Sequence, residues 1–201
     1  ISLLVINFLY GYANNPPNGR TGAPGENTCA TASCHSSYDL NSGPGDLSIS
    51  GPITYTPNEI LTFVINITHN DQERWGFELC ARDIELDQAG NIIIIDESIT
   101  QSSVSSGITY LKQTNSGTFD GQLDNAHWEF QWQAPNSDIG EVTFYFTGNA
   151  ANGNNNRLGD YIYATDFTIQ YAEEGCIPDG DVNLDGELNV LDIVSTVGFI
   201  L

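Results

Sequence analysis

The sequence predicts an all-β protein built as an immunoglobulin-like antiparallel β-sandwich, followed by a short loop and helix at the C-terminus. Three observations lead to this prediction. Apolar and polar residues alternate in several short runs, turn-forming Gly, Asn and Pro separate these runs, and aromatic and β-branched residues are plentiful. With 201 residues, the chain is long enough for one full-sized hydrophobic core and a small appendage.

Alternation with a period of two residues identifies the strands, because successive side chains of a strand point to opposite faces of the sheet. The segments "RWGFELCARD" and "NIIIID" add further strands, and the second is expected to be covered on both faces. Seven to nine strands are therefore expected, as in an immunoglobulin-like sandwich. The clearest runs place apolar side chains on one face: Leu61, Phe63, Ile65 and Ile67; Trp128, Phe130 and Trp132; Val142, Phe144 and Phe146; and the alternating run 161–171.

Composition divides the chain into five parts. Residues 1–13 are apolar and read either as the remnant of a signal peptide or as an arm that donates a strand to a neighbouring subunit. Residues 14–45 form a loop region rich in Gly, Pro and Asn, and residues 46–171 form the sandwich. A short acidic linker follows over residues 172–179, and residues 180–201 are predicted to form a calcium-binding repeat.

The charge balance excludes several classes of partner. Asp and Glu number 26 against five Lys and Arg, which gives a formal net charge of −21. Such an acidic chain repels the phosphates of nucleic acids and anionic lipids, and its apolar N-terminal run is too short to span a bilayer as a helix. No nucleophile elbow, phosphate loop or zinc-binding helix is present. We therefore expect a non-catalytic, secreted protein that is extracellular or attached to a cell surface.

The segment "CATASCH" offers two chemistries. Cys29 and Cys34 lie five positions apart, and His35 follows directly. Two thiols and an adjacent histidine are the groups that attach and ligate a c-type haem, although four residues rather than the usual two separate the thiols. The chain has no Met, so the sixth iron ligand would be a histidine; His69, at the inward end of a strand, is a better candidate than the outward-facing His127.

Disulfides are the alternative for the same cysteines. The chain has four cysteines, and an even number in a secreted protein is typical of a disulfide framework, here with three possible pairings. A site for another metal is a third interpretation of the motif.

The segment "DVNLDGELNVLD" fits a twelve-residue calcium loop, in which alternate residues supply oxygen ligands and a glycine at position six allows the sharp turn. The segment "NVLDIVSTVGFIL" then predicts a helix with an apolar stripe formed by Val190, Leu191, Val194, Val197 and Leu201. Gly186 occupies position six, and the predicted ligands are Asp181, Asn183, Asp185, the backbone carbonyl of Glu187, Asn189 and Asp192.

These residues resemble one repeat of a type I dockerin, a module that usually carries two such repeats. The segments "GRTGAPGENTCATASCH", "RWGFEL", "WEFQWQAP" and "GNAANGNNNRLGDYIY" together resemble a choice-of-anchor V domain, a reeler-like β-sandwich of secreted bacterial proteins. That resemblance implies a Cys/His motif similar to c-type haem sites. Where such domains usually have a histidine, in the segment "TYLKQTNSG", this chain has Gln113. With haem on Cys29 and Cys34, Cys80 and Cys176 could still form one disulfide.

Two functional hypotheses follow. In the first, the protein is a non-catalytic surface module with a calcium-bound tail that carries a covalently attached c-type haem for extracellular electron transfer. In the second, it is a structural subunit of a filament or surface layer, assembled through its apolar N-terminal arm and C-terminal helix, with Cys29 and Cys34 in disulfides. The expected partners are other copies of the chain or a surface protein such as a cohesin. A carbohydrate-binding sandwich is a third class.

Overall fold

The structure is a computed structural model, and it describes residues 15–31, 34–172, 180–182 and 185–198. Contacts divide the chain into two compact units, Ile1–Tyr171 and Ala172–Leu201. The first unit holds the β-sandwich and the second holds a loop followed by helix α1 (Val190–Gly198). The predictions for residues 1–13 and for most of the linker 172–179 concern residues outside the described ranges.

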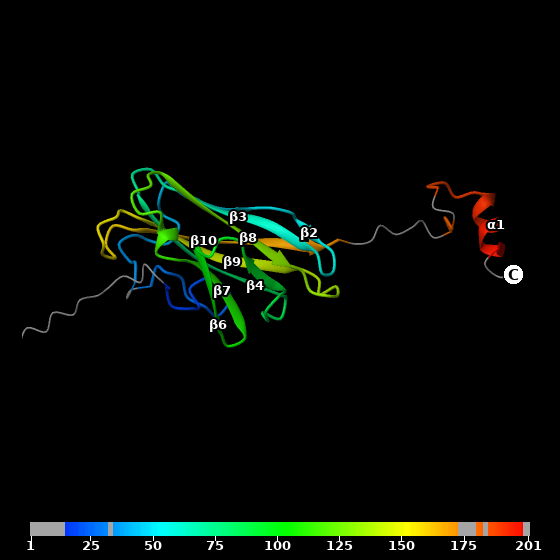
Figure 1. Cartoon of the computed structure of the whole chain (residues 1–201), viewed down its shortest axis with the longest axis horizontal. Coiled ribbons are helices and arrows are strands. Elements are labelled where there is room, and N and C mark those ends of the chain that lie inside the picture. The colour runs from blue at the N-terminus through cyan, green and yellow to red at the C-terminus, as the bar shows by residue number, and fades with distance from the viewer. Residues whose placement is uncertain (1–14, 32–33, 173–179, 183–184, 199–201) are drawn as a thin grey trace, which may run out of the picture. The chain divides into compact units, whose positions relative to one another are not determined.

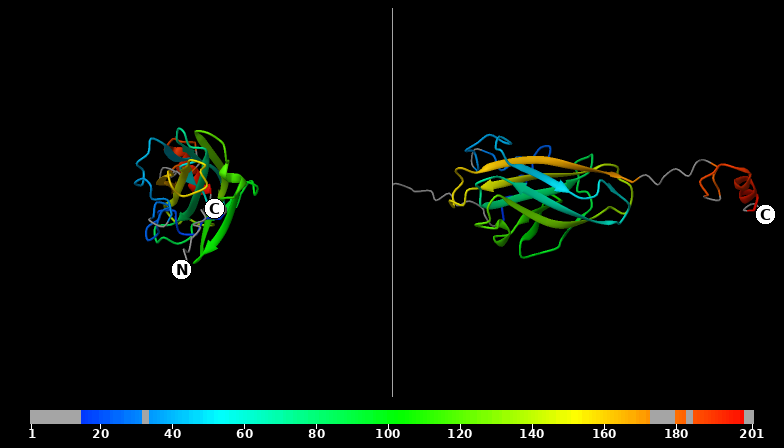
Figure 2. Two further views of the ribbon diagram at one scale, coloured as in Figure 1. Left: turned by 90° about the vertical axis from the view of Figure 1, so that its left-hand side faces the viewer. Right: turned by 90° about the horizontal axis from the view of Figure 1, so that it is seen from above.

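The sandwich consists of two packed sheets, which Figures 1 and 2 show from three directions. One sheet has four strands in the order β1-β3-β8-β5, and the other has six in the order β2-β10-β9-β4-β7-β6. The strands are β1 (Asp46–Ser50), β2 (Thr54–Tyr55), β3 (Ile60–Thr68), β4 (Arg74–Arg82), β5 (Asn91–Ile94), β6 (Thr100–Ser105), β7 (Ile108–Gln113), β8 (Asn125–Gln133), β9 (Val142–Ala151) and β10 (Tyr161–Tyr171).

Alternating side chains of both sheets form the main core, which confirms the predicted all-β sandwich and its inward faces. Phe63 of β3 packs against Phe130 of β8 in its own sheet and against Phe144 of β9 in the facing sheet, with ring centroids 5.6 and 4.9 Å apart. Trp128 and Trp132 are also completely buried, and each indole N–H donates to a backbone carbonyl, of Gly117 and Ala89 respectively. The buried tryptophans therefore leave no polar atom unpaired.

The described residues form ten strands, one more than the seven to nine predicted, and two of them differ from the prediction in other ways. The segment "NIIIID" was expected to be covered on both faces, but β5 is a half-buried strand at the edge of the four-stranded sheet. The two-residue strand β2 pairs with the C-terminal end of β10 in parallel, so the sandwich is not purely antiparallel. Both strands lie at sheet edges, where neighbours constrain a strand from one side only.

The N-terminal residues 15–31 cover the outer face of the six-stranded sheet. Cys80, Ile108 and Tyr110 point away from the main core and pack with Ala23 of this segment in a second, smaller apolar cluster. The segment contains little regular structure beyond a bridge between Thr21 and Thr28. The part of this face that β4 and β7 form is consequently a second interior rather than a solvent face.

In the C-terminal unit, the predicted helix is present as α1. The unit does not bury its described apolar side chains: Leu188, Val190, Leu191, Ile193 and Val194 are all exposed. The part of the expected stripe that falls on Val197 and Leu201 lies outside the residues whose side chains are described.

Candidate functional site

The loop 28–35 brings the two cysteines and the histidine of the "CATASCH" segment onto one turn. The backbone N–H of His35 donates to the carbonyl of Cys29 at 3.0 Å, and that of Cys34 donates to the carbonyl of Thr31 at 2.8 Å. Cys29 and Cys34 are each half-buried, and no disulfide joins any two of the three cysteines in the described ranges. Both thiols therefore belong to one short loop, beside the imidazole that follows them.

The imidazole of His35 is held by a buried carboxylate. Its Nδ1 lies 2.7 Å from Oδ2 of Asp160, whose side chain is 1% exposed, whereas the His35 side chain is 21% exposed. The other carboxylate oxygen, Oδ1, accepts the backbone N–H of Asn152 at 3.3 Å. When Nδ1–H donates to Asp160, the lone pair of the imidazole lies on Nε2, the atom through which such a histidine binds a metal.

A ladder of asparagines positions Asp160. In the loop between β9 and β10, backbone N–H groups of residues 154, 156 and 158 donate to side-chain oxygens of Asn152, Asn154 and Asn156, each two residues earlier. Asn and Asp favour such local turns. The Gly159 N–H donates to Oγ of Ser37 at 2.8 Å, which ties this loop to the residues just after His35.

His69 lies at the same end of the sandwich, directly after β3. It is buried, its Nδ1 lies 2.6 Å from the carbonyl of Asn70, and its Nε2 has no hydrogen-bond partner among the described residues. The ring packs on Tyr161, with centroids 4.4 Å apart. An unpaired imidazole nitrogen at a buried position is a candidate ligand atom, because burying a polar atom without a partner costs free energy.

Two open hollows flank this region. One, of about 470 Å³, is lined by residues that include His69, Asn152 and Gly159, and the other, of about 450 Å³, is lined by residues of the loop that carries Cys29. Tyr38 lines both and stacks on Tyr161, with ring centroids 4.0 Å apart. The volumes fall in the range of small-molecule sites. His35, Asp160 and His69 are thus neighbours around Asn152 and Gly159.

The thiols differ in their surroundings. Burial is the main cause that raises the pKa of Cys29 to about 12, and nearby Glu78 and Cys34 act in the same direction. Burial also raises the pKa of Cys80, which lies under the N-terminal segment with its Sγ 3.5 Å from Oγ1 of Thr21. Both thiols therefore stay protonated at neutral pH. Cys176, the expected disulfide partner of Cys80, lies outside the described residues.

Part of the predicted calcium loop is described, and its two terminal carboxylates point inward. Asp181 and Asp192 are buried although the unit is small. Asp181 accepts the backbone N–H groups of residues 185 and 186, and Oδ2 of Asp192 accepts that of Asn189 at 2.8 Å. Gly186 adopts a φ of 84°, as the predicted turn requires.

The other predicted calcium ligands are less completely defined. Oδ1 of Asp185 accepts the N–H of Glu187, and Oδ1 of Asn189 accepts that of Leu191. Asn183 lies outside the described residues. Within the described ranges, no three His, Cys, Asp or Glu side chains converge as a metal site, whereas a calcium loop also uses amide and carbonyl oxygens.

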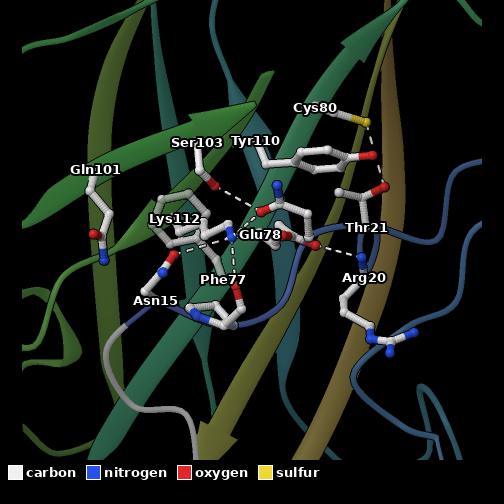
Figure 3. A network of polar contacts seen from close by, with 12 residues as sticks. Asn15, Arg20, Thr21, Phe77, Glu78, Cys80, Gln101, Ser103, Tyr110 and Lys112 are labelled. Carbon is white, nitrogen blue, oxygen red and sulfur yellow. Dashed lines mark hydrogen bonds and ion pairs between the residues drawn. The ribbon is translucent and has the colours of Figure 1, made fainter. Parts of the chain in front are cut away.

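A polar cluster that sequence analysis did not predict lies between the N-terminal segment and the outer face of the six-stranded sheet (Figure 3). Glu78 of β4 and Lys112 of β7 are cross-strand partners, 0% and 1% exposed, with Oε1 and Nζ 3.5 Å apart. Nζ also contacts the side-chain oxygen of Asn18 and, at 2.5 Å, the carbonyl of Pro16. The only hint in the sequence is the chain's single lysine within an otherwise buried strand.

Comparisons with known proteins identify no family. No family model matches the chain, and no curated protein matches it. The resemblances to choice-of-anchor V and dockerin domains therefore stay predictions.

Three solved structures are similar to parts of the chain. They are a non-cellulosomal cohesin from Archaeoglobus fulgidus (10% identity, 64% of this chain and 93% of that one, TM-score 0.41), the CARDB domain of a Pyrococcus furiosus protein in complex with di-metal ions (9%, 67% and 93%, 0.32) and the N-terminal domain of the Streptococcus gordonii adhesin Sgo0707 (6%, 67% and 33%, 0.37). Because these TM-scores are low, we draw no functional conclusion from them. No helix in the described ranges is long and apolar enough to cross a membrane.

Proposed function

We propose that the protein is a non-catalytic extracellular module that carries a covalently attached c-type haem on Cys29 and Cys34, with His35 as an iron ligand, and a calcium ion in its C-terminal loop. The observation that carries the haem proposal is the contact between His35 and Asp160. A buried carboxylate that orients an imidazole through Nδ1 is the outer-shell arrangement that fixes a metal-binding histidine and increases its basicity.

The described residues fit this group in three respects. Cys29 and Cys34 lie on one short loop directly before His35, which is the arrangement that attachment of a haem through two thioether bonds requires. The Nε2 atom of His35 remains for iron when Nδ1 is used by Asp160. His69 lines the adjacent hollow, and its buried Nε2, which has no hydrogen-bond partner among the described residues, is the candidate for a second iron ligand. A haem held there would supply one-electron transfer, and the protein would supply the ligands and their orientation.

The haem proposal is tested by producing the full chain in a host with c-type cytochrome maturation machinery. We expect a Soret absorption band and a covalent mass increase of one haem that survives denaturation. The Cys29→Ala/Cys34→Ala double variant should lack the covalent haem, while Cys80→Ala, which alters a cysteine on a different face, serves as the matched control.

Two results would contradict the haem proposal. One is a protein without a Soret band and without added mass after maturation. The other is a Cys29–Cys34 disulfide in the mature chain, found by peptide mapping without reduction. The second result would support the disulfide interpretation of the motif.

A second candidate function is assembly with a partner through the tail, and the exposed apolar side chains of α1 favour it. Val190, Ile193 and Val194 are each more than 60% exposed. Calcium bound by the preceding loop would fix the start of this helix, and the partner would be another copy of the chain or a surface protein. Sedimentation velocity with and without chelator tests this candidate, and a chain that is monomeric in both conditions would contradict self-assembly.

A further inference from the structure

Beyond this proposed function, we propose that Lys112 and Asn18 form an intramolecular isopeptide bond, with Glu78 as the group that relays the protons. The bond would join the N-terminal segment to strand β7. It requires no ligand, metal or enzyme, and it does not depend on whether the protein binds haem.

The reacting groups are already in contact. The Nζ atom of Lys112 contacts Oδ1 of Asn18, and the carboxamide carbon Cγ is one bond away from that oxygen. Oδ1 also accepts a hydrogen bond of 2.8 Å from the hydroxyl group of Ser103 on β6. A donor at this oxygen polarises the carbonyl group and stabilises the negative charge that develops there when the amine attacks.

Glu78 has the position and the free oxygen that a proton relay needs. Its Oε2 accepts the backbone N–H of Arg20 at 2.5 Å. Its Oε1 lies 3.5 Å from Nζ and has no hydrogen-bond donor among the described residues. Figure 3 shows Glu78, Lys112 and Ser103 around the same point, beneath the N-terminal segment.

The surroundings favour the uncharged forms that the reaction needs. Burial raises the pKa of Glu78 to about 7, against the hydrogen bond from Arg20 and the attraction of Lys112. Burial also lowers the pKa of Lys112, against the attraction of Glu78. A buried ion pair carries a large desolvation penalty, and a neutral amide removes one of its two charges.

The chemistry balances without an oxidant or reductant. Lys112 gives one proton to Glu78, and the neutral amine attacks Cγ of Asn18, so that the carbonyl electron pair moves to Oδ1. Glu78 then passes its proton to Nδ2 of Asn18 and takes one from Nζ. The carbonyl re-forms as the Cγ–Nδ2 bond breaks, and ammonia leaves. One C–N bond forms and one breaks.

The product would close a loop between positions 94 residues apart. A covalent link across so long a loop restricts the unfolded chain strongly. It would also anchor the start of the segment that leads into the Cys29–His35 loop. Within the described residues, polar contacts and one small apolar cluster hold this segment in place.

Peptide mapping of the full-length protein tests the bond directly. The chain has only five tryptic sites, including Arg20, Lys112 and Arg157. Because trypsin does not cleave after an acylated lysine, we expect a branched peptide in which the fragment ending at Arg20 is joined to the fragment 83–157. Its mass should be about 17 Da below the sum of the two fragments, the mass of one ammonia.

Matched variants locate the bond. Asn18→Ala should remove the branched peptide completely, whereas Asn15→Ala should retain it, although the Asn15 side-chain oxygen also lies 3.4 Å from Nζ. Glu78→Gln keeps the shape of the side chain but cannot exchange protons as a carboxyl group does, so we expect loss of the bond. Far-UV circular dichroism of each variant shows whether it is folded.

Release of the separate peptides 83–112 and 113–157 from the wild-type protein, without any branched product, would overturn the proposal. This result needs no variant and so does not depend on how well a variant folds. A branch at Asn15, located by fragmentation, would overturn the assignment of Asn18. Full retention of the bond in Glu78→Gln would overturn the role of Glu78.

Discussion

The burial of Glu78 leads to a specific prediction about how stability depends on pH. Burial raises the pKa of this carboxyl group from 4.5 to about 7 in the folded protein. Between these two values the folded protein binds more protons than the unfolded chain, so the free energy of unfolding falls as pH rises. The contribution of Glu78 is therefore complete below pH 4.5 and is lost as pH rises through about 7.

The interval of about 2.5 pH units corresponds to about 3 kcal/mol, at 1.36 kcal/mol for each unit. The ammonium group of Lys112 lowers the pKa of Glu78. Conversion of that ammonium to an amide would therefore raise the pKa of Glu78 further. The free energy of unfolding would still fall as pH rises, but by more. A buried carboxyl group with this pKa would also be largely protonated in mildly acidic solution.

The assay is urea unfolding of the wild-type protein and of Glu78→Gln at several pH values between 4.5 and 7.5, followed by far-UV circular dichroism. The quantity of interest is the change with pH of the difference in free energy between the two proteins, because the other carboxylates contribute equally to both and the bond that the variant is expected to lack shifts its whole curve. We expect the wild type to lose about 3 kcal/mol relative to the variant across this range. Parallel curves would refute the reasoning.

Three further predictions concern the core, the close packing of Gly43 next to His69, and the tail. Phe63→Ala removes a completely buried ring that contacts both sheets, so we expect a loss of about 3 to 5 kcal/mol in urea unfolding, whereas Ile60→Ala at an exposed position of the same strand should change little. Gly43→Ala would place a Cβ 2.1 Å from the hydroxyl of Tyr163, so we expect a loss of about 1 to 3 kcal/mol by the same assay; unchanged stability would contradict the close packing there. Calcium titration by calorimetry should show binding that Asp181→Ala abolishes, and equal binding by this variant would contradict the predicted loop.

The sequence predicted the sandwich well because the alternation of apolar and polar residues can be recognised within each strand by itself. A period of two residues in one strand shows which face is buried, and in β8 the predicted Trp128, Phe130 and Trp132 are the buried side chains. It could not predict β2, because two residues carry no periodicity and their parallel pairing depends on a distant strand. The edge position of β5 was missed for a related reason: four apolar residues in succession look alike at an edge and in a sheet centre.

The candidate site was predicted in its residue types but not in its partners. Cys29, Cys34 and His35 are adjacent in sequence, so their spacing could suggest a chemistry. Asp160 lies 125 residues after His35, in a loop whose asparagines are equally compatible with an ordinary turn. Such a contact depends on how two loops meet at one end of the sandwich, which no local pattern records.

Glu78 of β4 and Lys112 of β7 are polar side chains on the face of the sheet that the N-terminal segment covers. In an alternating strand, polar residues between apolar ones normally indicate a solvent-exposed face, yet Glu78 and Lys112 are almost completely buried. They are buried because the N-terminal segment, which lacks an apolar face of its own, packs over them through polar contacts. That segment meets Lys112 near its start and continues to the loop that carries His35. Loosening the segment at Asn18 should therefore weaken the contact between His35 and Asp160.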